Sequence, residues 1–517
     1  MKNVKRGLFV CWLLVVSVML FAQDDFGFGF DDEDSGDTFS GSGAAFGSAT
    51  PSAVNIGGHM GAALLGYTND VSEGFSHVWR PGRIDGRLDF SASGSFGEAV
   101  INLKLNPAGF ITQLQSDSDS KFNGFSNTVA FDEAYARAWF GDFELEAGMR
   151  KLTWGKADSL GPLDVINPFD YTELTSLNNV MNIKIANALI HGSYRFGQFS
   201  KIETLFVPVF EPWHFASKGR WAPAQVSDFN ITQLAVATAT GSSVTDPGKI
   251  AYLQTYTATA LSSMVEQMTE AYPDTTTLDY AQMGLRFTTT IGSADIGAQY
   301  YYGWLGQPAV VMLDFATSIE QLGTALAAAS DPIEIDQALQ QIAPPKIVYN
   351  RYHQIGVDWA QVLLGFNVRA ELAANITNDL KGDDGAVYNP HLAWSFGFDR
   401  DLVWGINLNL QANETIKLFY DKISGNPLLD TEAGTDMTST RLTAALSKKI
   451  LRDELELRAA ALWGIEDSDF LIMPAIIWTK DAVQVEVSGG FFGGDEKGQL
   501  GQYHDNSFIK VGIKYSF

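Results

Sequence analysis

From residue 53 onward, apolar and polar residues alternate in segments of about ten residues, the strand length that a barrel wall needs. Because successive side chains of a strand point to opposite faces, each segment predicts a strand with one apolar and one polar face. The segments are 54–67, 84–94, 97–106, 129–140, 142–153, 183–196, 199–208, 279–290, 293–304, 347–359, 363–375, 386–398, 401–413, 438–449, 453–463, 470–479, 481–490 and 506–517. We therefore expect an all-β fold, a transmembrane antiparallel β-barrel of about 18 strands, with 16 as the alternative.

The connections between these segments alternate between short and long. Tight turns are expected at or near Ser93 to Phe96, Gly141-Asp142, Phe196 to Phe199, Ile291-Gly292, Asp399-Arg400, Leu451-Arg452 and Thr479-Lys480. The long connections are 107–128, 154–182, 209–278, 305–346 and 414–437. Transmembrane barrels have short periplasmic turns and longer extracellular loops, so the long connections are expected outside the cell.

Two of the long loops contain predicted helices. Asp246-Pro247 begins a run to about Tyr272, and Asp331-Pro332 begins another to about Ile342, each with an acidic N-cap followed by proline. A shorter helix is predicted near 315–329. The loops at 209–278 and 305–346 are expected to fold into the lumen, to cap its mouth, or to lie on the surface.

Charged residues gather on one face of the predicted strands. In 454–463, Glu454, Glu456 and Arg458 share one side, and the apolar residues share the other. A charge on the lipid face costs roughly 2–4 kcal/mol at mid-depth, so these side chains are expected in the lumen. The candidate pore-lining residues are Arg87, Asp89, Glu98, Lys104, Glu133, Arg137, Glu144, Glu146, Arg150, Arg369, Glu371, Glu454, Glu456, Arg458, Glu486, Lys510 and Lys514.

The N-terminus predicts export. Basic residues precede an apolar run from Leu8 to Ala22, which is typical of a secretory signal peptide, residues 1–22. Residues 23–52 are acidic and rich in glycine and serine, and are predicted to be a disordered tether before the barrel at 53–517. The single cysteine, Cys11, lies within the signal peptide, which excludes disulfides from the mature chain.

Charge and motifs exclude several functions. The formal net charge is −25, and removal of three basic residues with the signal peptide would make it −28, so no nucleic-acid partner is expected. The sequence contains no HExxH, no G-x-S-x-G and no phosphate-binding glycine loop. We therefore expect no catalytic residues, no metal, no cofactor and no enzymatic activity.

The last segment ends in alternating apolar residues and a terminal aromatic residue, Phe517. It resembles the C-terminal recognition strand of bacterial outer-membrane proteins. That resemblance implies an assembly signal at Tyr515 and Phe517 that is read by the barrel-assembly machinery. We expect this strand to pair with the first strand and close the barrel, and we expect deletion of Phe517 to impair assembly.

A second resemblance lies at 145–175. Gly148-Met149-Arg150-Lys151-Leu152-Thr153-Trp154-Gly155-Lys156 is followed by Val165-Ile166-Asn167-Pro168-Phe169-Asp170. This is similar to a group of large porin-like outer-membrane proteins in which G-R-Q-x-x-x-W-G leads into N-P-x-D, and related barrels export anionic polysaccharide. Met149-Arg150-Lys151 stands where that pattern has Arg-Gln. From the residues alone, Trp154-Gly155 marks the end of a strand and Asn167-Pro168 a turn.

These patterns predict an outer-membrane porin or channel that passes small hydrophilic solutes through a charged lumen. Outer-membrane lipid is the expected surrounding, and the barrel is expected to be a monomer or a trimer. A surface adhesion or structural protein is one alternative, and a transporter of hydrophobic molecules is another. A third alternative is a barrel that is plugged by its own paired charges.

Overall fold

The structure, a computed structural model, describes residues 53–69, 79–105, 129–177, 180–216, 219–223, 273–311, 346–426 and 429–517, with isolated positions at 317–337. The predicted signal peptide, the tether and the helix at 246–272 lie outside the described residues. The described positions within the predicted helices at 315–329 and 331–342 are almost all helical, and the Ala329 N–H donates to the Ala325 carbonyl at 2.9 Å. Among the described residues, no helix is long and apolar enough to cross a bilayer.

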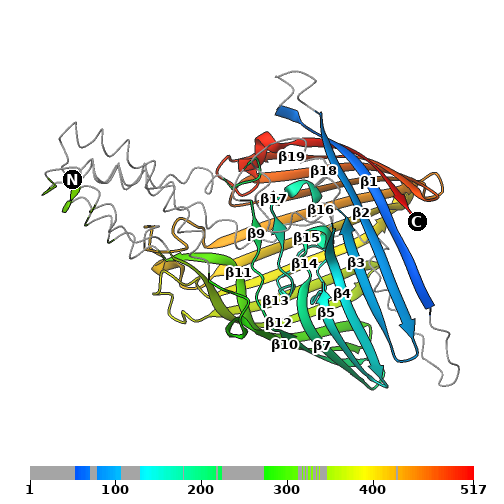
Figure 1. The fold of residues 1–517 in the computed structure, drawn as a ribbon, viewed down its shortest axis with the longest axis horizontal. Helices are drawn as coiled ribbons and strands as arrows, with labels where there is room; N and C mark the ends of the chain where they lie inside the picture. The colour runs from blue at the N-terminus through cyan, green and yellow to red at the C-terminus, as the bar shows by residue number, and fades with distance from the viewer. Residues whose placement is uncertain are drawn as a thin grey trace.

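Eighteen antiparallel strands form the wall of a barrel (Figure 1). The first nine are β1 (Ala53–Tyr67), β2 (Trp79–Gly94), β3 (Gly97–Leu105), β4 (Val129–Phe140), β5 (Phe143–Arg150), β7 (Asn187–Phe196), β8 (Ser200–Val207), β10 (Gln282–Ile291) and β11 (Ala294–Val311). The others are β12 (Lys346–Leu363), β13 (Phe366–Thr377), β14 (His391–Leu402), β15 (Ile406–Lys417), β16 (Thr438–Ile450), β17 (Leu455–Gly464), β18 (Asp469–Lys480), β19 (Val483–Gly494) and β20 (Phe508–Ser516). The predicted fold and strand number are confirmed.

Each strand pairs with its neighbours in sequence, and the last strand returns to the first. β20 pairs with β1 from Ser516 opposite His59 to Phe508 opposite Tyr67. The Gly58 N–H donates to the Phe517 carbonyl at 3.0 Å, and the Phe517 N–H donates to the Gly58 carbonyl at 2.9 Å. In Figure 1 the blue first strand and the red last strand lie side by side. The wall therefore has no free edge.

The two ends of the barrel differ in their connections. At one end, which we call the turn end, neighbouring strands are joined by a few residues, as at 141–142 and 292–293. At the other, the loop end, most connections are long: 106–128, 151–186, 208–281, 312–345 and 418–437. The connection 465–468 between β17 and β18 is a short one at the loop end. Apart from that case, the predicted alternation of short and long connections is confirmed.

The turn predicted at Asp399-Arg400 is wrong. β14 continues to Leu402, and the turn is Val403 to Gly405, where Trp404 and Gly405 have φ of 67° and 66°. Asp399 lies before the turn, and its Oδ1 is 2.7 Å from Arg369 Nη1 across the inner face. Charged side chains inside a barrel resemble turn residues in sequence, because both are polar.

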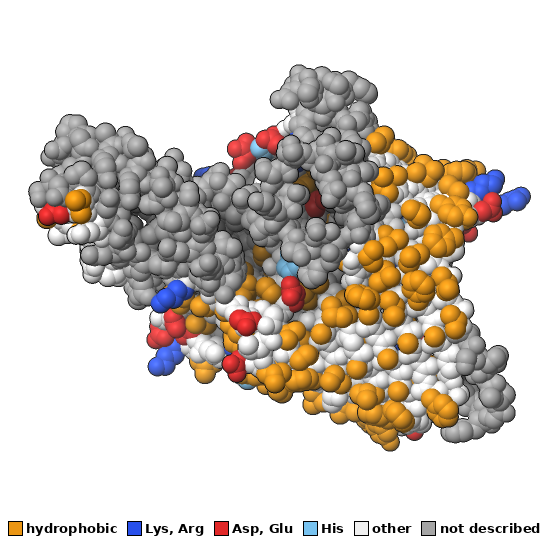
Figure 2. Space-filling view, in the orientation of Figure 1, with side chains coloured by type: hydrophobic (Ala, Val, Ile, Leu, Met, Phe, Trp, Pro, Cys, Tyr) orange, Lys and Arg blue, Asp and Glu red, His pale blue; other side chains and the backbone are white. Residues whose placement is uncertain are grey.

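The outer face of the wall is apolar. On β12, Ile355 is 55% exposed and Val357 is 48% exposed, whereas Gln354 and Asp358, which face inward, are 0% and 1% exposed. Hydrophobic side chains cover the visible wall in Figure 2, while acidic and basic side chains gather toward its ends. This alternation is that of a wall with lipid on its outside.

Two connections fold back into the barrel. We call 151–186, between β5 and β7, the plug segment, and 208–223, after β8, the strap segment; 178–179 and 217–218 are outside the described residues. β6 (Asp170–Tyr171) of the plug segment pairs in parallel with β9 (His214–Phe215) of the strap segment. The connection predicted outside the barrel at 154–182 therefore lies in the lumen, because its side chains and backbone meet the inner face of the wall.

Candidate functional site

The plug segment leaves and re-enters the wall at one place. Asn167 bridges the two ends: its Oδ1 accepts from the Leu152 N–H at 2.7 Å, and its Nδ2 donates to the carbonyls of Arg150 and Ile185, each at 2.9 Å. Burial raises the pKa of the Asp164 carboxyl above its ordinary value, opposed by Lys184, whose Nζ lies 2.6 Å from Asp164 Oδ2. These contacts fold the segment into a compact loop before it reaches the opposite wall.

Glu371 on β13 is the main anchor of the plug segment. One carboxylate oxygen accepts from the N–H groups of Lys156 and Ala157, the latter at 2.7 Å, and the other accepts from the Leu163 N–H at 3.3 Å. Gly155 has φ of 101°, which favours glycine. A Cβ at Gly155 or at Gly161 would clash with the carboxylate, so the segment can wrap it only because both residues are glycine.

Amide side chains on the neighbouring strands add further anchors. Gln411 on β15 accepts from the N–H groups of Asp158 and Ser159, at 3.0 and 3.2 Å. Gln299 on β11 and Gln354 on β12 donate to the carbonyls of Leu163 and Pro162, at 3.0 and 2.8 Å. Each bond satisfies a backbone group that would otherwise be buried without a partner. The first half of the plug segment is thus held to β11–β15 by hydrogen bonds.

The second half is held by apolar packing. Leu174 and Leu177, each 1% exposed, belong to a buried cluster with inner-face residues of β16 to β20, which are Ala445, Ala460, Leu462, Leu471, Met473, Phe492 and Phe508. The same cluster includes Trp221 of the strap segment, whose ring lies 5.6 Å from that of Phe492. The lumen at this level is therefore filled by chain rather than by wall side chains alone.

Charged side chains on the inner face, from the level where the plug segment begins toward the turn end, form what we call the charged belt. Asp132, which the sequence analysis missed, lies 2.8 Å from the Nζ atoms of both Lys104 and Lys151 and 3.4 Å from Arg87 Nη1. The pairing register between β3 and β4 shifts here: Glu133 faces Asn102 and Phe131 faces the next residue, Leu103, so Asp132 has no opposite residue on β3. Asp132 is thus the extra residue of a β-bulge, which breaks the period-2 pattern on which the prediction depended.

Most other candidate pore-lining residues meet partners of opposite charge. Arg137 lies 3.0 Å from Glu98 and 3.2 Å from Glu144, and it also contacts Glu146, which contacts Arg150. The remaining close pairs are Arg87–Asp89, Arg369–Asp158, Arg369–Asp399, Arg458–Glu456 and Lys510–Glu486. Candidates of both signs are brought together, so these contacts do not produce a ring of one sign.

Three candidate pore-lining residues are not in these ion pairs. Glu133 Oε1 accepts from the Lys151 N–H at 2.9 Å, at the start of the plug segment. Glu454 lies in the turn before β17, where its carbonyl accepts from the Thr479 N–H at 2.7 Å. Lys514 faces Gln484 of β19 in the strand register, near the end of the chain. Their role as pore-lining residues stays a prediction.

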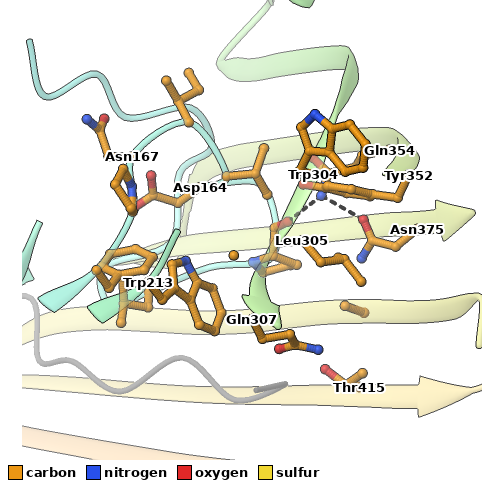
Figure 3. Close-up of a pocket in the computed structure, with 18 of the residues that line it drawn as sticks. Asp164, Asn167, Trp213, Trp304, Leu305, Gln307, Tyr352, Gln354, Asn375 and Thr415 are labelled. Carbon is orange, nitrogen blue, oxygen red and sulfur yellow. Dashed lines mark hydrogen bonds between the residues drawn. The ribbon is translucent and has the colours of Figure 1, made fainter. Parts of the chain in front are cut away.

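Toward the loop end, a cavity of about 120 Å³ lies above the plug segment. The plug segment at 160–169 forms one side and Trp213 of the strap segment another, with inner-face residues of β10 to β16 around them. Figure 3 shows Gln307, Gln354 and Asn375 on the wall strands, with Asn167 and Trp213 on the other side of the pocket. We call this cavity the amide pocket, because Asn167, Asn187, Gln282, Gln307, Gln354, Asn375 and Asn413 line it.

The sequence contains signals for the plug segment. Residues 470–478 of β18 are apolar at every position, and Leu471 and Met473 face the cluster while Ile472 and Ile476 are exposed outside. A strand that is apolar on both faces needs a cover on both. Lipid would cover the outer face of β18, so another part of the chain had to cover its inner face. Trp154-Gly155 lies near the beginning of the plug segment. Asn167, which precedes Pro168, makes the hydrogen bonds that join the two ends of the segment. Asp170 makes a local turn, in which its Oδ1 accepts from the Thr172 N–H at 3.0 Å.

Comparison with known proteins adds fold-level likeness only. No family model matches the sequence, and no curated protein matches it. OccAB3 of Acinetobacter baumannii is 8% identical, with a TM-score of 0.45 over 90% of this chain and 99% of that chain. OmpF of Salmonella typhi, in complex with daunomycin, is 8% identical, with a TM-score of 0.38 over 91% and 100%. Wzi of Escherichia coli, described as a carbohydrate-binding β-barrel involved in group 1 capsule assembly, is 10% identical, with a TM-score of 0.42 over 89% and 84%. At these values the likeness assigns no function to this chain.

Proposed function

We propose that this protein is an outer-membrane channel for small hydrophilic solutes, and that the plug segment sets how freely they pass. The observation that carries the proposal is the attachment of the plug segment to Glu371 through three backbone N–H groups. An eighteen-stranded wall encloses more space than its side chains fill. A loop held across that space by a few polar contacts is an element that can move without unfolding the wall.

The polarity on both sides of the plug segment supports a hydrophilic solute. The charged belt runs from the level where the plug segment begins toward the turn end, and the amide pocket lies toward the loop end, so a solute would meet polar groups on both sides of the plug segment. The apolar inner face of β16–β19 is covered by Leu174 and Leu177. Transport of hydrophobic molecules, which needs a free apolar surface, is therefore less well supported.

The wider setting is part of the same proposal. The predicted signal peptide at 1–22 exports the chain, the tether at 23–52 precedes the barrel, and Tyr515 and Phe517 address the barrel-assembly machinery. The barrel then lies in outer-membrane lipid as a monomer or a trimer. The resemblance at 145–175 to porin-like proteins supports the proposal, because its residues are those that begin and bridge the plug segment.

Conductance across a planar bilayer tests the proposal. We expect small unitary currents from the refolded wild-type protein, and larger currents from the Glu371→Ala variant, since three plug N–H groups lose their acceptor. The control is Glu486→Ala, because Glu486 is also a carboxylate on the inner face but is half-buried and pairs with Lys510 rather than with the plug segment. Absence of current from the wild type and from Glu371→Ala, both with barrel circular dichroism and heat-modifiable electrophoretic mobility, would refute the channel.

A further inference from the structure

The amide pocket contains side-chain amide atoms that have no protein partner among the described residues. Gln307 makes no hydrogen bond there, although the residue is only 2% exposed. Gln282 is 3% exposed, and its Oε1 accepts from the Tyr301 hydroxyl and the Trp304 N–H. Its Nε2 is left without a partner among the described residues. Asn187 is 3% exposed, and its Nδ2 donates to the Ile166 carbonyl at 3.0 Å. Its Oδ1 is left without a partner among the described residues.

Buried polar atoms in proteins are nearly always hydrogen-bonded, so three such amides around one cavity indicate a site for a polar guest. Their free atoms include both donors and acceptors. The other amides of the pocket are satisfied: Gln354, for example, donates to the Pro162 carbonyl and to Asn375 Oδ1, at 2.8 and 2.9 Å. Among the described residues, the free amide atoms of the pocket are therefore those of Gln307, Gln282 and Asn187, and Trp304 Nε1, a further pocket donor, is also buried without a partner.

An irregularity in β11 accompanies the position of Gln307. Trp304 pairs with Arg351 and Pro308 pairs with Tyr349, so Leu305, Gly306 and Gln307 together oppose the single residue between those partners on β12. Such bulges re-aim side chains and are typical next to functional sites. The Gly306 carbonyl of the bulge accepts from the Trp213 N–H at 2.9 Å, which attaches the strap segment beside the pocket. Figure 3 shows Gln307 below the Trp213 indole.

Each charged side chain of the pocket already has a hydrogen-bond or ion-pair partner. Asp164 pairs with Lys184 at 2.6 Å, and Arg441 pairs with Asp467 and Asp469, at 2.8 and 3.1 Å. Glu211 pairs with His214 at 2.6 Å when that imidazole is protonated. The carboxylate of Glu414 accepts from Trp394 Nε1 at 2.6 Å, and Glu414 occupies an outward-facing position of β15. A charged guest would find no free counter-charge among these groups, whereas a neutral guest needs none.

We infer that the amide pocket binds a small neutral polyhydroxylated molecule, such as a single sugar ring. A hydroxyl group both donates and accepts, as the free amide atoms require, and the C–H face of a sugar ring packs on the indole of Trp213 or the phenol ring of Tyr352. The cavity of about 120 Å³ has room for roughly ten water-sized positions, the size of a monosaccharide. The inference rests on the proposed function, because it places this molecule on the path of solutes toward the plug segment.

Binding to the full-length refolded protein tests the inference without any need for transport. The protein is kept in lauryl dimethylamine oxide, a detergent that has no sugar headgroup. Saturation-transfer NMR is recorded with three probes that share one ring and differ in charge: D-glucose, D-glucosamine and D-glucuronate. We expect saturable binding of glucose, and binding of glucosamine and glucuronate at least fivefold weaker. Saturable glucose binding without conductance would leave the inference standing and refute the channel, so the two failures are distinguishable.

Two variants place the binding in the amide pocket. Gln307→Met keeps the size of the side chain but removes its donor and acceptor, and Ala393→Leu fills the cavity from β14. Each should weaken glucose binding at least fivefold. Gln361→Met is the control, because Gln361 lies near the turn end and donates to Ser293 Oγ at 2.8 Å. No saturable binding of glucose by the wild type, undiminished binding by both pocket variants, or tighter binding of either charged sugar would overturn the inference. Heat-modifiable mobility verifies that each variant is folded.

Discussion

The two halves of the plug segment are held to the wall in different ways. The first half, 151–169, meets β11–β15 through hydrogen bonds to a few side chains, with Glu371 and Gln411 as acceptors for five backbone N–H groups, and its Trp154 and Ile166 also pack in a small apolar cluster with residues of β7, β8, β11 and β12. The second half, 170–186, meets β16–β20 through an apolar cluster. Hydrogen bonds are directional and depend on single atoms, whereas apolar contacts are shared among many neighbours. A small change can thus remove much of the hold on the first half, whereas it can only weaken the hold on the second.

The largest effect is expected from removing both acceptors. In the Glu371→Ala/Gln411→Ala variant, five plug N–H groups lose their partners, and hydrogen bonds to charged groups contribute about 1.5–3 kcal/mol each. We expect mean conductance in planar bilayers to rise more than tenfold. The matched control is Glu486→Ala/Gln484→Ala on β19, where the same two changes are made on the inner face away from the plug segment. Equal conductance in the two double variants would contradict the anchoring role.

A smaller increase is expected from crowding the anchor instead of deleting it. Gly161→Ala places a Cβ against both the Glu371 carboxylate and the Ala157 Cβ, and overpacking of this kind costs about 1–3 kcal/mol. Conductance should rise several-fold, less than in the double variant. Gly425→Ala is a suitable control, since a Cβ there has open space within 4 Å. The same current from Gly161→Ala as from the wild type would show that the close wrapping of the carboxylate is not needed.

Weakening the apolar half should change stability more than conductance. Leu174→Ala/Leu177→Ala removes two buried side chains, at about 2–5 kcal/mol each. Amide hydrogen exchange should become faster at 174–177 but remain slow at 156–163, and conductance should rise by less than about threefold, because the hydrogen-bonded half remains attached. Fast exchange across both halves would mean that the plug segment is one cooperative unit, and its two halves would then not be held independently.

The smallest effect is expected in the charged belt. Arg458→Gln removes the partner of Glu456, whose Oε1 lies 2.5 Å from Arg458 Nε. Because the belt holds many groups of both signs, we expect unchanged conductance and a shift toward cations of less than about twofold in permeability ratio, measured from reversal potentials in a salt gradient. A shift toward anions would contradict the placement of Glu456 in the lumen.

The wall could be predicted from the sequence, and the plug segment could not. Strand pairing follows from local alternation, which is why all eighteen strands were found. The anchor depends on Glu371 meeting the Leu163 N–H, which is 208 residues away in the chain. Glu371 was singled out as an inner-face carboxylate, but alternation shows only the face of a side chain and not what lies opposite. The apolar inner face of β18 was the one local sign that chain would fill the lumen.

The pairing of β1 with β20 also fixes the order of events during assembly. Thr68 and Ser507, whose backbones are joined by a hydrogen bond of 2.8 Å, are separated by 439 residues. Until the last residues of the chain are available, the sheet has two open edges, and the inner-face residues of β19 and β20 that pack in the plug cluster are not yet in place. We therefore expect closure to be the last contact to form, and the plug segment to reach its final packing only with it. An insertion intermediate that is held open at this seam should therefore be unplugged as well.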